Sequence, residues 1–193
     1  MITHIQGKLV EKNPTDVVID CNGIGYLINI SLHTYSQIPD RENIKLYTHL
    51  QIKEDSHSLY GFSSLAEREI FRLLISVSGI GSSTARTMLS SLTPKQVREG
   101  IATNDVALIQ SIKGIGAKTA QRVIIDLKDK ILKIYDIDEV SVSKSNTSKD
   151  EALSALEVLG FTKKQSERVV DKIIAEDNDA NVEDIIKQAL KNL

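Results

Sequence analysis

Two short segments of the chain have the residue types and spacing of a phosphate-binding turn. The first reads Val77-Ser78-Gly79-Ile80-Gly81-Ser82-Ser83-Thr84-Ala85, and the second, 35 residues later, reads Ile112-Lys113-Gly114-Ile115-Gly116-Ala117-Lys118-Thr119-Ala120. Each segment follows one run of helical periodicity and precedes another. Helix, Gly-Ile-Gly turn and helix in this order predict a helix-hairpin-helix motif, which this chain contains twice.

The chemistry of these turns is anion binding. Glycine permits a positive φ and lets a phosphate approach the backbone without a Cβ in the way. The helix that begins after each turn directs its unbonded N–H groups and positive dipole end at the same place, so phosphate is the expected anion. We expect Ile80 and Ile115 to anchor the turns in the core. The predicted ligand-binding residues are Ser78, Gly79, Gly81, Ser82, Ser83, Arg86, Lys113, Gly114, Gly116, Ala117, Lys118, Thr119 and Arg122.

The distribution of charge indicates which phosphate the turns meet. The chain has 24 Lys+Arg and 26 Asp+Glu, a net charge of −2. Residues 1–65 carry −2, residues 66–135 carry +5 and residues 136–193 carry −5. Two hairpins in register within the only basic third predict binding to the DNA backbone. Because backbone phosphates carry no sequence information, the binding should be salt-sensitive and selective for DNA structure.

Two other interpretations of the glycine turns exist. Glycine between helices often serves only to make a tight turn. The run Gly114-Ile115-Gly116-Ala117-Lys118-Thr119 also resembles a nucleotide-binding phosphate loop. A Walker loop, however, has Gly directly before Lys and a strand before the loop. Here Ala precedes Lys and the upstream periodicity is helical, which argues against nucleotide hydrolysis by this chain.

The elements that position the hairpins begin with a β domain over residues 1–63. Short runs rich in Ile, Val, Tyr and Thr are separated by turn-prone stretches such as Lys12-Asn13-Pro14. Five such strands suit a closed barrel without exposed edges, and the five-stranded OB-fold is the predicted one. The predicted strands span residues 2–10, 15–20, 25–30, 44–52 and 58–62.

Residues 64–135 predict the helical domain that carries both hairpins. Ser64 and Glu67 form a capping box, in which the Ser64 oxygen accepts from the Glu67 N–H and the Glu67 carboxylate reaches back. The run Thr93-Pro94-Lys95-Gln96 begins another helix. A long helix over about residues 117–134 follows the second hairpin, with Val123, Ile124, Leu127 and Ile131 on its apolar side.

The last third predicts a linker and a small helical domain. Residues 136–148 contain four serines and no regular period, as in an exposed linker. Residues 149–193 predict a three-helix bundle, with a stop at Gly160, a second start at Thr162 and a cap at Asn181. The predicted fold class is therefore α+β and multidomain. The charge of −5 over residues 136–193 disfavours DNA contact and favours a protein partner. That partner must bind whichever apolar residues of the bundle remain exposed outside its core. The apolar positions of the bundle, most of which its own core needs, include Leu153, Leu156, Leu159, Phe161, Val169, Val170, Ile173 and Ile174.

Other classes of site find little support. Cys21 is the single cysteine, so neither an internal disulfide nor a paired-cysteine zinc site is available. The four histidines are scattered outside any His-Glu-x-x-His frame, and we expect no metal and no cofactor. The N-terminus lacks the pattern of a signal peptide, and no apolar run approaches the ~20 residues of a membrane span. We therefore expect a cytoplasmic protein without a membrane partner.

The order of these features resembles the RuvA family of Holliday junction branch-migration proteins from end to end. The resemblance is carried by the two hairpins, by Lys53-Glu54-Asp55-Ser56-His57-Ser58-Leu59-Tyr60-Gly61-Phe62 and by the run from Gln121-Arg122 to Asp126-Leu127-Lys128-Asp129-Lys130. It implies a non-catalytic subunit that recognises four-way DNA junctions in recombination, DNA repair and the SOS response to DNA damage.

The resemblance also implies partners and a further site. It implies a homotetramer, or a pair of tetramers, on an open junction, with a RuvB ATPase motor bound by residues 149–193 and contact with the RuvC resolvase. It further implies that Glu54 and Asp55 form an acidic pin at the crossover, where fixed carboxylates repel phosphates. From the residues alone this pair is more typical of a solvated hairpin tip, and it is the resemblance that favours the pin. One position departs from the family, because Ser83 stands where members often carry a lysine, and Arg86 is a potential substitute.

Two other functions fit parts of the sequence. A helix-hairpin-helix glycosylase or a structure-specific nuclease would use Asp126 and Asp129. Their spacing near Lys128 and Lys130 is more typical of ion pairs on a helix surface, and neither a nucleophilic lysine nor an acid cluster accompanies them. A single-strand binder would stack bases on barrel aromatics, but the chain has only three Phe and five Tyr.

Overall fold

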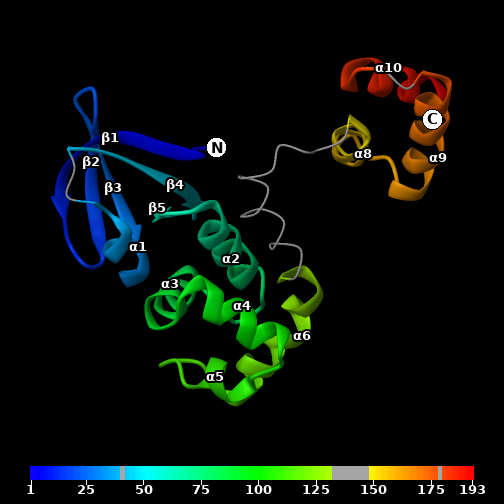
Figure 1. Cartoon of the computed structure of the whole chain (residues 1–193). Coiled ribbons are helices and arrows are strands. Elements are labelled where there is room, and N and C mark those ends of the chain that lie inside the picture. Colours follow the sequence, from blue (N-terminus) through cyan, green and yellow to red (C-terminus); the bar gives the residue numbers. More distant parts are fainter. Residues whose placement is uncertain (40–41, 132–147, 178–179) are drawn as a thin grey trace. The chain divides into compact units, whose positions relative to one another are not determined.

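The computed structural model describes residues 1–39, 42–131, 148–177 and 180–193 (Figure 1). The chain divides into two compact units, Met1–Glu139 and Val140–Leu193. The first contains the predicted barrel and both hairpins, and the second contains the predicted helical bundle. The expected linker lies outside the described residues, except for Ser148, which begins a helix.

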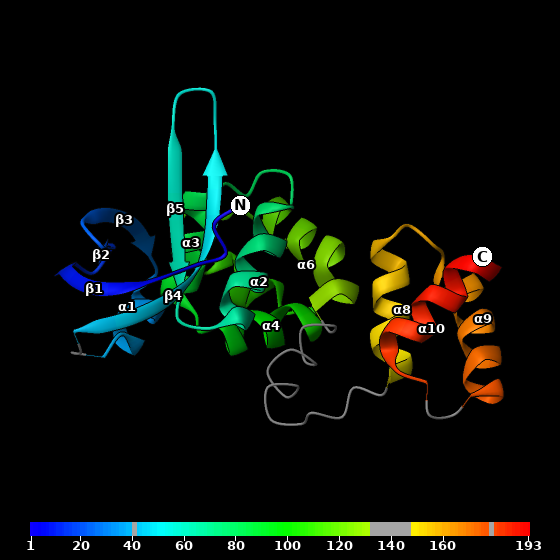
Figure 2. The same cartoon turned by 90° about the horizontal axis from the view of Figure 1, so that it is seen from above.

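The first unit begins with the predicted five-stranded barrel, which is confirmed. Its strands β1 (His4–Lys12), β2 (Asp16–Cys21), β3 (Ile24–Ile30), β4 (Asn43–Ile52) and β5 (His57–Phe62) close in the order β1-β2-β3-β5-β4. Strands β3 and β5 pair in parallel, and the other neighbours pair antiparallel. The β4–β5 hairpin projects well beyond the rest of the barrel (Figure 2).

The barrel closes around alternate side chains of its strands. Val17 and Ile19 on β2 are fully buried, and so is Ile28 on β3, as expected where one face of each strand is turned inward. Closure between β3 and β5 also needs glycine at position 61. A Cβ built there would lie 2.6 Å from Ile28 Cγ2, closer than two carbon atoms can approach.

A short helix that the sequence analysis did not predict connects β3 to β4. This helix, α1, spans Leu32–Gln37, and the side chain of Ser31 caps it by accepting a hydrogen bond from the Thr34 N–H at 3.0 Å. Ser31 and Thr34 are both buried. Six residues are fewer than two helical turns, so no helical period is visible in the sequence.

After the barrel, the described part of the first unit (up to residue 131) contains five helices: α2 (Leu65–Ile75), α3 (Ser82–Ser91), α4 (Pro94–Ala102), α5 (Val106–Gln110) and α6 (Ala117–Ile131). Their shared core includes Ile70, Leu74, Met88, Val97, Val123 and Leu127. The capping box at Thr93 is confirmed in both directions. The box at Ser64 is confirmed in one, since its Oγ accepts from the Glu67 N–H at 3.1 Å.

The prediction that the Glu67 carboxylate reaches back to the cap residue Ser64 is wrong. The carboxylate accepts from the backbone N–H of Ser63, one residue before the cap, at 3.1 Å. It is drawn away from Ser64 because buried hydroxyl donors of the barrel side bind it as well. Residues 132–134, the expected last part of the long helix, lie outside the described residues.

The second unit is the predicted three-helix bundle. Its helices are α8 (Ser148–Val158), α9 (Lys163–Glu176) and α10 (Val182–Asn192). Gly160, with φ +97°, ends the first helix as expected. Asn181 caps α10 by accepting from the Asp184 N–H at 2.9 Å. The core includes Ala152, Leu156, Val170, Ile173 and Ile185.

Candidate nucleic-acid interface

The first hairpin joins α2 to α3 and has the predicted backbone. Gly79 is exposed and has φ +94°, a left-handed conformation that L side chains rarely adopt. The Ile80 N–H donates to the Val77 carbonyl at 3.0 Å, which closes the turn. The Ile80 side chain is buried in the helical core, as expected for an anchor.

The second hairpin joins α5 to α6 and repeats this geometry. Gly114 is exposed and has φ +91°. The Ile115 N–H donates to the Ile112 carbonyl at 3.1 Å, and the Ile115 side chain is buried. The two turns therefore share one backbone conformation, and the repeat in the sequence is a repeat in structure.

A helix begins directly after each turn. The first bonds of its i to i−4 ladder run from Ala85 to the Gly81 carbonyl and from Ala120 to the Gly116 carbonyl, both at 2.9 Å. The N–H groups ahead of these donors belong to the first helical turn, which has no intrahelical acceptor for them. They are the donors that an anion would use.

The four turn glycines border open space. A Cβ built at Gly79, Gly81, Gly114 or Gly116 would have no heavy atom within 4 Å. Within the described residues, nothing therefore requires glycine at Gly81 or Gly116, neither of which has a positive φ. Close approach of an external ligand to the backbone would explain glycine there.

The side chains around the two turns differ. Ser78 and Lys113 occupy equivalent positions and are exposed, as are Ser83 and Lys118. Ser82 is buried, whereas its equivalent Ala117 is exposed. Arg122 is exposed on α6 and Thr119 is half-buried. The second hairpin thus presents three exposed cations, Lys113, Lys118 and Arg122, and the first presents hydroxyls.

Arg86, predicted as a DNA contact in the first hairpin, bonds to the barrel. Its Nη1 donates to the Thr15 carbonyl at 3.2 Å and to Asn29 Oδ1 at 3.0 Å. These bonds tie α3 to the region of β2 and β3. One nitrogen of the guanidinium thus has a structural role in the joint between barrel and helices.

A second link between barrel and first hairpin was not predicted. The Tyr60 hydroxyl on β5 donates to Ser82 Oγ at 3.0 Å. Tyr60 and Phe62 also pack on Phe71 of α2, with ring centroids 5.1 Å and 4.9 Å away. The outer face of β5 is therefore part of the helical core.

A buried carboxylate makes the third link. Glu67 on α2 is fully buried, and its oxygens accept from Ser31 Oγ and Thr34 Oγ1, both at 2.7 Å. The Ser63 N–H and Oγ donate to it as well, each at 3.1 Å. Four donors compensate for the loss of water around this carboxylate. They hold the start of α2 against α1.

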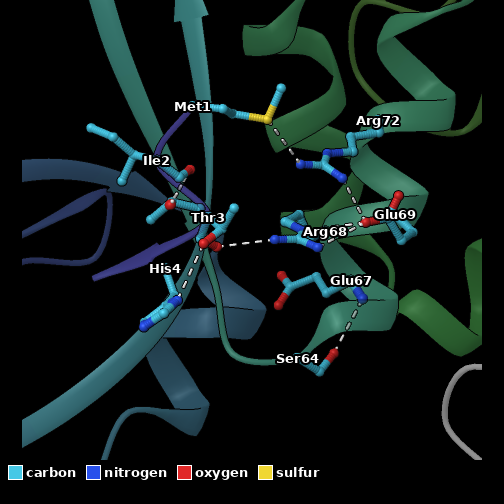
Figure 3. Close-up of polar contacts among 10 residues, drawn as sticks. Met1, Ile2, Thr3, His4, Ser64, Glu67, Arg68, Glu69 and Arg72 are labelled. Carbon is cyan, nitrogen blue, oxygen red and sulfur yellow. Dashed lines mark hydrogen bonds and ion pairs between the residues drawn. The ribbon is translucent and has the colours of Figure 1, made fainter. Parts of the chain in front are cut away.

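Two arginines of α2 face the N-terminal segment rather than the hairpins (Figure 3). Arg68 donates to the Thr3 carbonyl at 3.0 Å, and Arg68 and Arg72 pair with Glu69 at 3.1 Å and 2.8 Å. The pKa of the nearby His49 lies below its usual value because the ring is partly buried and because both arginines repel its proton. Part of the +5 charge of this region therefore supports the fold.

The predicted acidic pair lies at the tip of the β4–β5 hairpin. Glu54 and Asp55 are both exposed, and the Lys53 N–H donates to the Ser56 carbonyl at 2.8 Å to close the tip. Figure 2 shows how far this hairpin extends. The two carboxylates therefore stand at the end of a projecting arm.

Two further findings concern other kinds of site. Among the described residues, no three His, Cys, Asp or Glu side chains gather in a group that could hold a metal ion. Within the same residues, no helix combines the length and the apolar character that a membrane crossing needs.

Comparison with known proteins matches each part of this architecture. The model of the RuvA N-terminal domain matches residues 1–61, and the model of the RuvA C-terminal domain matches residues 148–193. A SAM-like helix-hairpin-helix tandem matches residues 71–129. The Holliday junction branch migration complex subunit RuvA of Flavobacterium psychrophilum is 70% identical over the full length of both chains. The chain belongs to the RuvA family.

Other RuvA subunits are similar along their whole length. The subunit of Christiangramia forsetii is 68% identical and that of Porphyromonas gingivalis is 42% identical, each with all of both chains covered. The RuvA resemblance expected from the sequence is confirmed. The RuvA N-terminal match covers the barrel up to Gly61, and the tandem match contains both glycine turns.

Proposed function

We propose that this chain is the DNA-binding subunit of a Holliday junction branch-migration complex and has no catalytic activity of its own. The observation that carries the proposal is the pair of hairpins with matching positive φ at Gly79 and Gly114, each opening a helix whose first N–H groups can bind phosphate. Relatives of this chain bear the name of such a subunit.

The two hairpins would bind duplex arms through backbone phosphates. Such contacts position a protein on DNA without reading its bases. The exposed Glu54 and Asp55 would lie where strands converge, and their charges would repel phosphates instead of binding them. Attraction at the hairpins and repulsion at the arm would select an open junction over a plain duplex.

The three-helix bundle would bind the RuvB motor. Among its described residues, four large apolar side chains are exposed: Val158 and Leu159 at the end of α8, and Leu190 and Leu193 near the end of the chain. Leu153, Leu156, Val170 and Ile173 are buried in the bundle and are thereby excluded from a docking face. An exposed apolar group on an acidic module suits a protein partner better than DNA.

The number of copies would follow from the substrate. A four-way junction has four arms, and a ring of four identical subunits would offer each arm the same pair of hairpins. We therefore propose a homotetramer, used singly or as a facing pair, with RuvC acting on the same junction. Since chromosomal DNA is the proposed substrate, the site of action would be the cytoplasm.

A gel-shift comparison tests the proposal. The purified chain would be titrated onto a four-way junction, a linear duplex and a single strand of shared sequence, with and without magnesium. We expect the junction to bind most tightly and to stay intact. Equal affinity for all three would contradict the proposal, and strand cleavage would favour a nuclease.

The acidic arm has its own test. The double variant Glu54→Gln/Asp55→Asn removes both charges and keeps the shape of the side chains. We expect equal or tighter junction binding together with disturbed branch migration in the presence of the motor. Simple loss of binding would show that the pair does not act by repulsion.

A further inference from the structure

The strand that follows the acidic arm reaches the first hairpin. β5 begins two residues after Asp55, and Tyr60 lies on it. The Tyr60 hydroxyl donates to Ser82 Oγ at 3.0 Å. Ser82 is the first residue of α3 and directly follows Gly81. A barrel side chain therefore bonds to the residue that starts the phosphate-binding helix.

The position of this hydroxyl is well defined. The Tyr60 ring lies 5.1 Å from the ring of Phe71, which is fully buried, and the two planes are inclined by 31°. The neighbouring residue Gly61 is pressed against Ile28 in the barrel wall. Only two torsions, χ1 and χ2, set the position of a tyrosine oxygen. Because its ring is packed, Tyr60 holds its oxygen at one place.

The bond from Tyr60 determines which hydrogen-bonding capacity of the Ser82 hydroxyl is left for a ligand. A serine hydroxyl has one proton to donate and two lone pairs to accept with. Tyr60 uses a lone pair, so the Ser82 proton remains available for another acceptor. Ser82 lies at the helix start, where a bound phosphate oxygen would be that acceptor.

We propose that Tyr60 is a positioning residue for the first hairpin: its bond to Ser82 Oγ sets that hydroxyl as a phosphate donor and fixes the hairpin relative to the acidic arm. The inference rests on the proposed function, since it names how one of the two phosphate sites is organised.

The second hairpin lacks the bond between Tyr60 and a serine hydroxyl. The residue equivalent to Ser82 is Ala117, which has no polar side-chain atom to accept from a tyrosine. The residue equivalent to Ser83 is the exposed Lys118. The second hairpin thus has an exposed charge one residue after the position at which the first has a hydroxyl held by the barrel.

A double-mutant cycle on junction affinity tests the inference. Tyr60→Phe keeps the ring and removes only the hydroxyl, and Ser82→Ala copies the residue of the second hairpin. We expect each variant to bind a four-way junction about two- to tenfold more weakly, the range for one hydrogen bond. The double variant should bind no more weakly than Ser82→Ala, because Tyr60 acts only through Ser82.

Two further variants are controls for the double-mutant cycle of Tyr60 and Ser82. Tyr26→Phe alters a half-buried barrel tyrosine on β3 and should leave affinity unchanged. Tyr60→Phe combined with Lys118→Ala should show losses that add, because the two residues serve different hairpins. Thermal unfolding of each variant, measured in parallel, ensures that affinities are compared between folded proteins.

The outcomes separate this inference from the proposed function. Failure of the unaltered chain to prefer the junction would contradict the proposed function itself. With that preference intact, wild-type affinity in Tyr60→Phe would overturn the inference. Losses from Tyr60→Phe and Ser82→Ala that add in full would overturn it too, because Tyr60 would then act by another route.

Discussion

The two hairpins share a backbone and differ in what holds them. Both have a glycine near φ +90°, a buried isoleucine and a helix that starts at once. The first is joined to the barrel through Tyr60, Glu67 and Arg86. The second lies between α5 and α6 and presents exposed Lys113 and Lys118.

If both turns bind phosphate as proposed, this difference lets one motif bind an anion in two ways. A hairpin fixed to a rigid neighbour offers donors whose positions are set before the ligand arrives, which lowers the entropic cost of binding. A hairpin with exposed lysines relies on charge, which acts at longer range and weakens in salt. We infer that the first hairpin sets the register between DNA and the acidic arm, while the second supplies attraction.

The largest expected effect comes from removing the left-handed glycines. Gly79→Val and Gly114→Val should each weaken junction binding about tenfold or more, or ~1.4 kcal/mol. The β-branched side chain strains the turn and blocks the approach of phosphate. Gly23→Val is the matched control, because Gly23 has φ +90°, borders open space and lies in the β2–β3 turn. Normal binding by both hairpin variants would exclude these turns as phosphate sites.

The next effect concerns the joint that only the first hairpin has. Glu67→Gln replaces a buried acceptor of four hydrogen bonds with a group that donates on one side, and should lower the free energy of unfolding by about 1–3 kcal/mol. Urea unfolding followed by tyrosine fluorescence measures this. Glu99→Gln is the control, since the exposed Glu99 only faces Lys95 at 3.8 Å and should change stability by less than about 0.5 kcal/mol. Equal effects of the two variants would contradict a joint at Glu67.

Exchanging the residues at the equivalent positions 83 and 118 should change how strongly junction binding depends on salt. Lys118→Ser should weaken binding severalfold and make the dependence of log affinity on log salt shallower by about 0.9, the value for one phosphate contact. Ser83→Lys should make it steeper by about the same amount. Lys95→Ser, an exposed lysine at the start of α4, should change neither quantity. If Lys118→Ser left the salt dependence intact, charge would not distinguish the second hairpin.

The smallest expected effect is a pH dependence of stability caused by His49, which lies near α2 of the first hairpin. His49 packs on Phe71 at 5.6 Å, and folding lowers its pKa through burial and through Arg72 and Arg68. Protonation therefore opposes folding, so its contribution to stability is complete above the unfolded pKa of about 6.5 and decreases as pH falls below that value. The melting temperature should fall less between pH 7.5 and pH 5 in His49→Gln than in the unaltered chain. Identical falls would exclude His49 as a cause.

Local patterns were sufficient to predict the barrel, both hairpins and the bundle. The strands appear as β-branched runs between turns, and Gly79 and Gly114 were placed correctly because a left-handed turn demands their residue type. The helix α1 was missed because six residues show no period. The joint at Glu67 was missed because its partners Ser31 and Thr34 lie 36 and 33 residues away.

Arg86, whose contact with DNA stays a prediction, has partners in the fold that the sequence did not indicate. Its place in the first turns of the helix after Gly81 predicted a phosphate contact. Its partner Asn29 lies 57 residues away on β3, and only folding brings the two together. Residue type and spacing indicate what a side chain can bind, whereas the choice among available partners depends on the tertiary structure.

The most direct test of phosphate recognition through two hairpins is a salt titration on four-way junctions of unrelated sequence. Recognition of shape through the backbone predicts equal affinities at each salt concentration and one common slope of log affinity against log salt. A marked preference for one sequence, or an affinity that salt leaves unchanged, would contradict it.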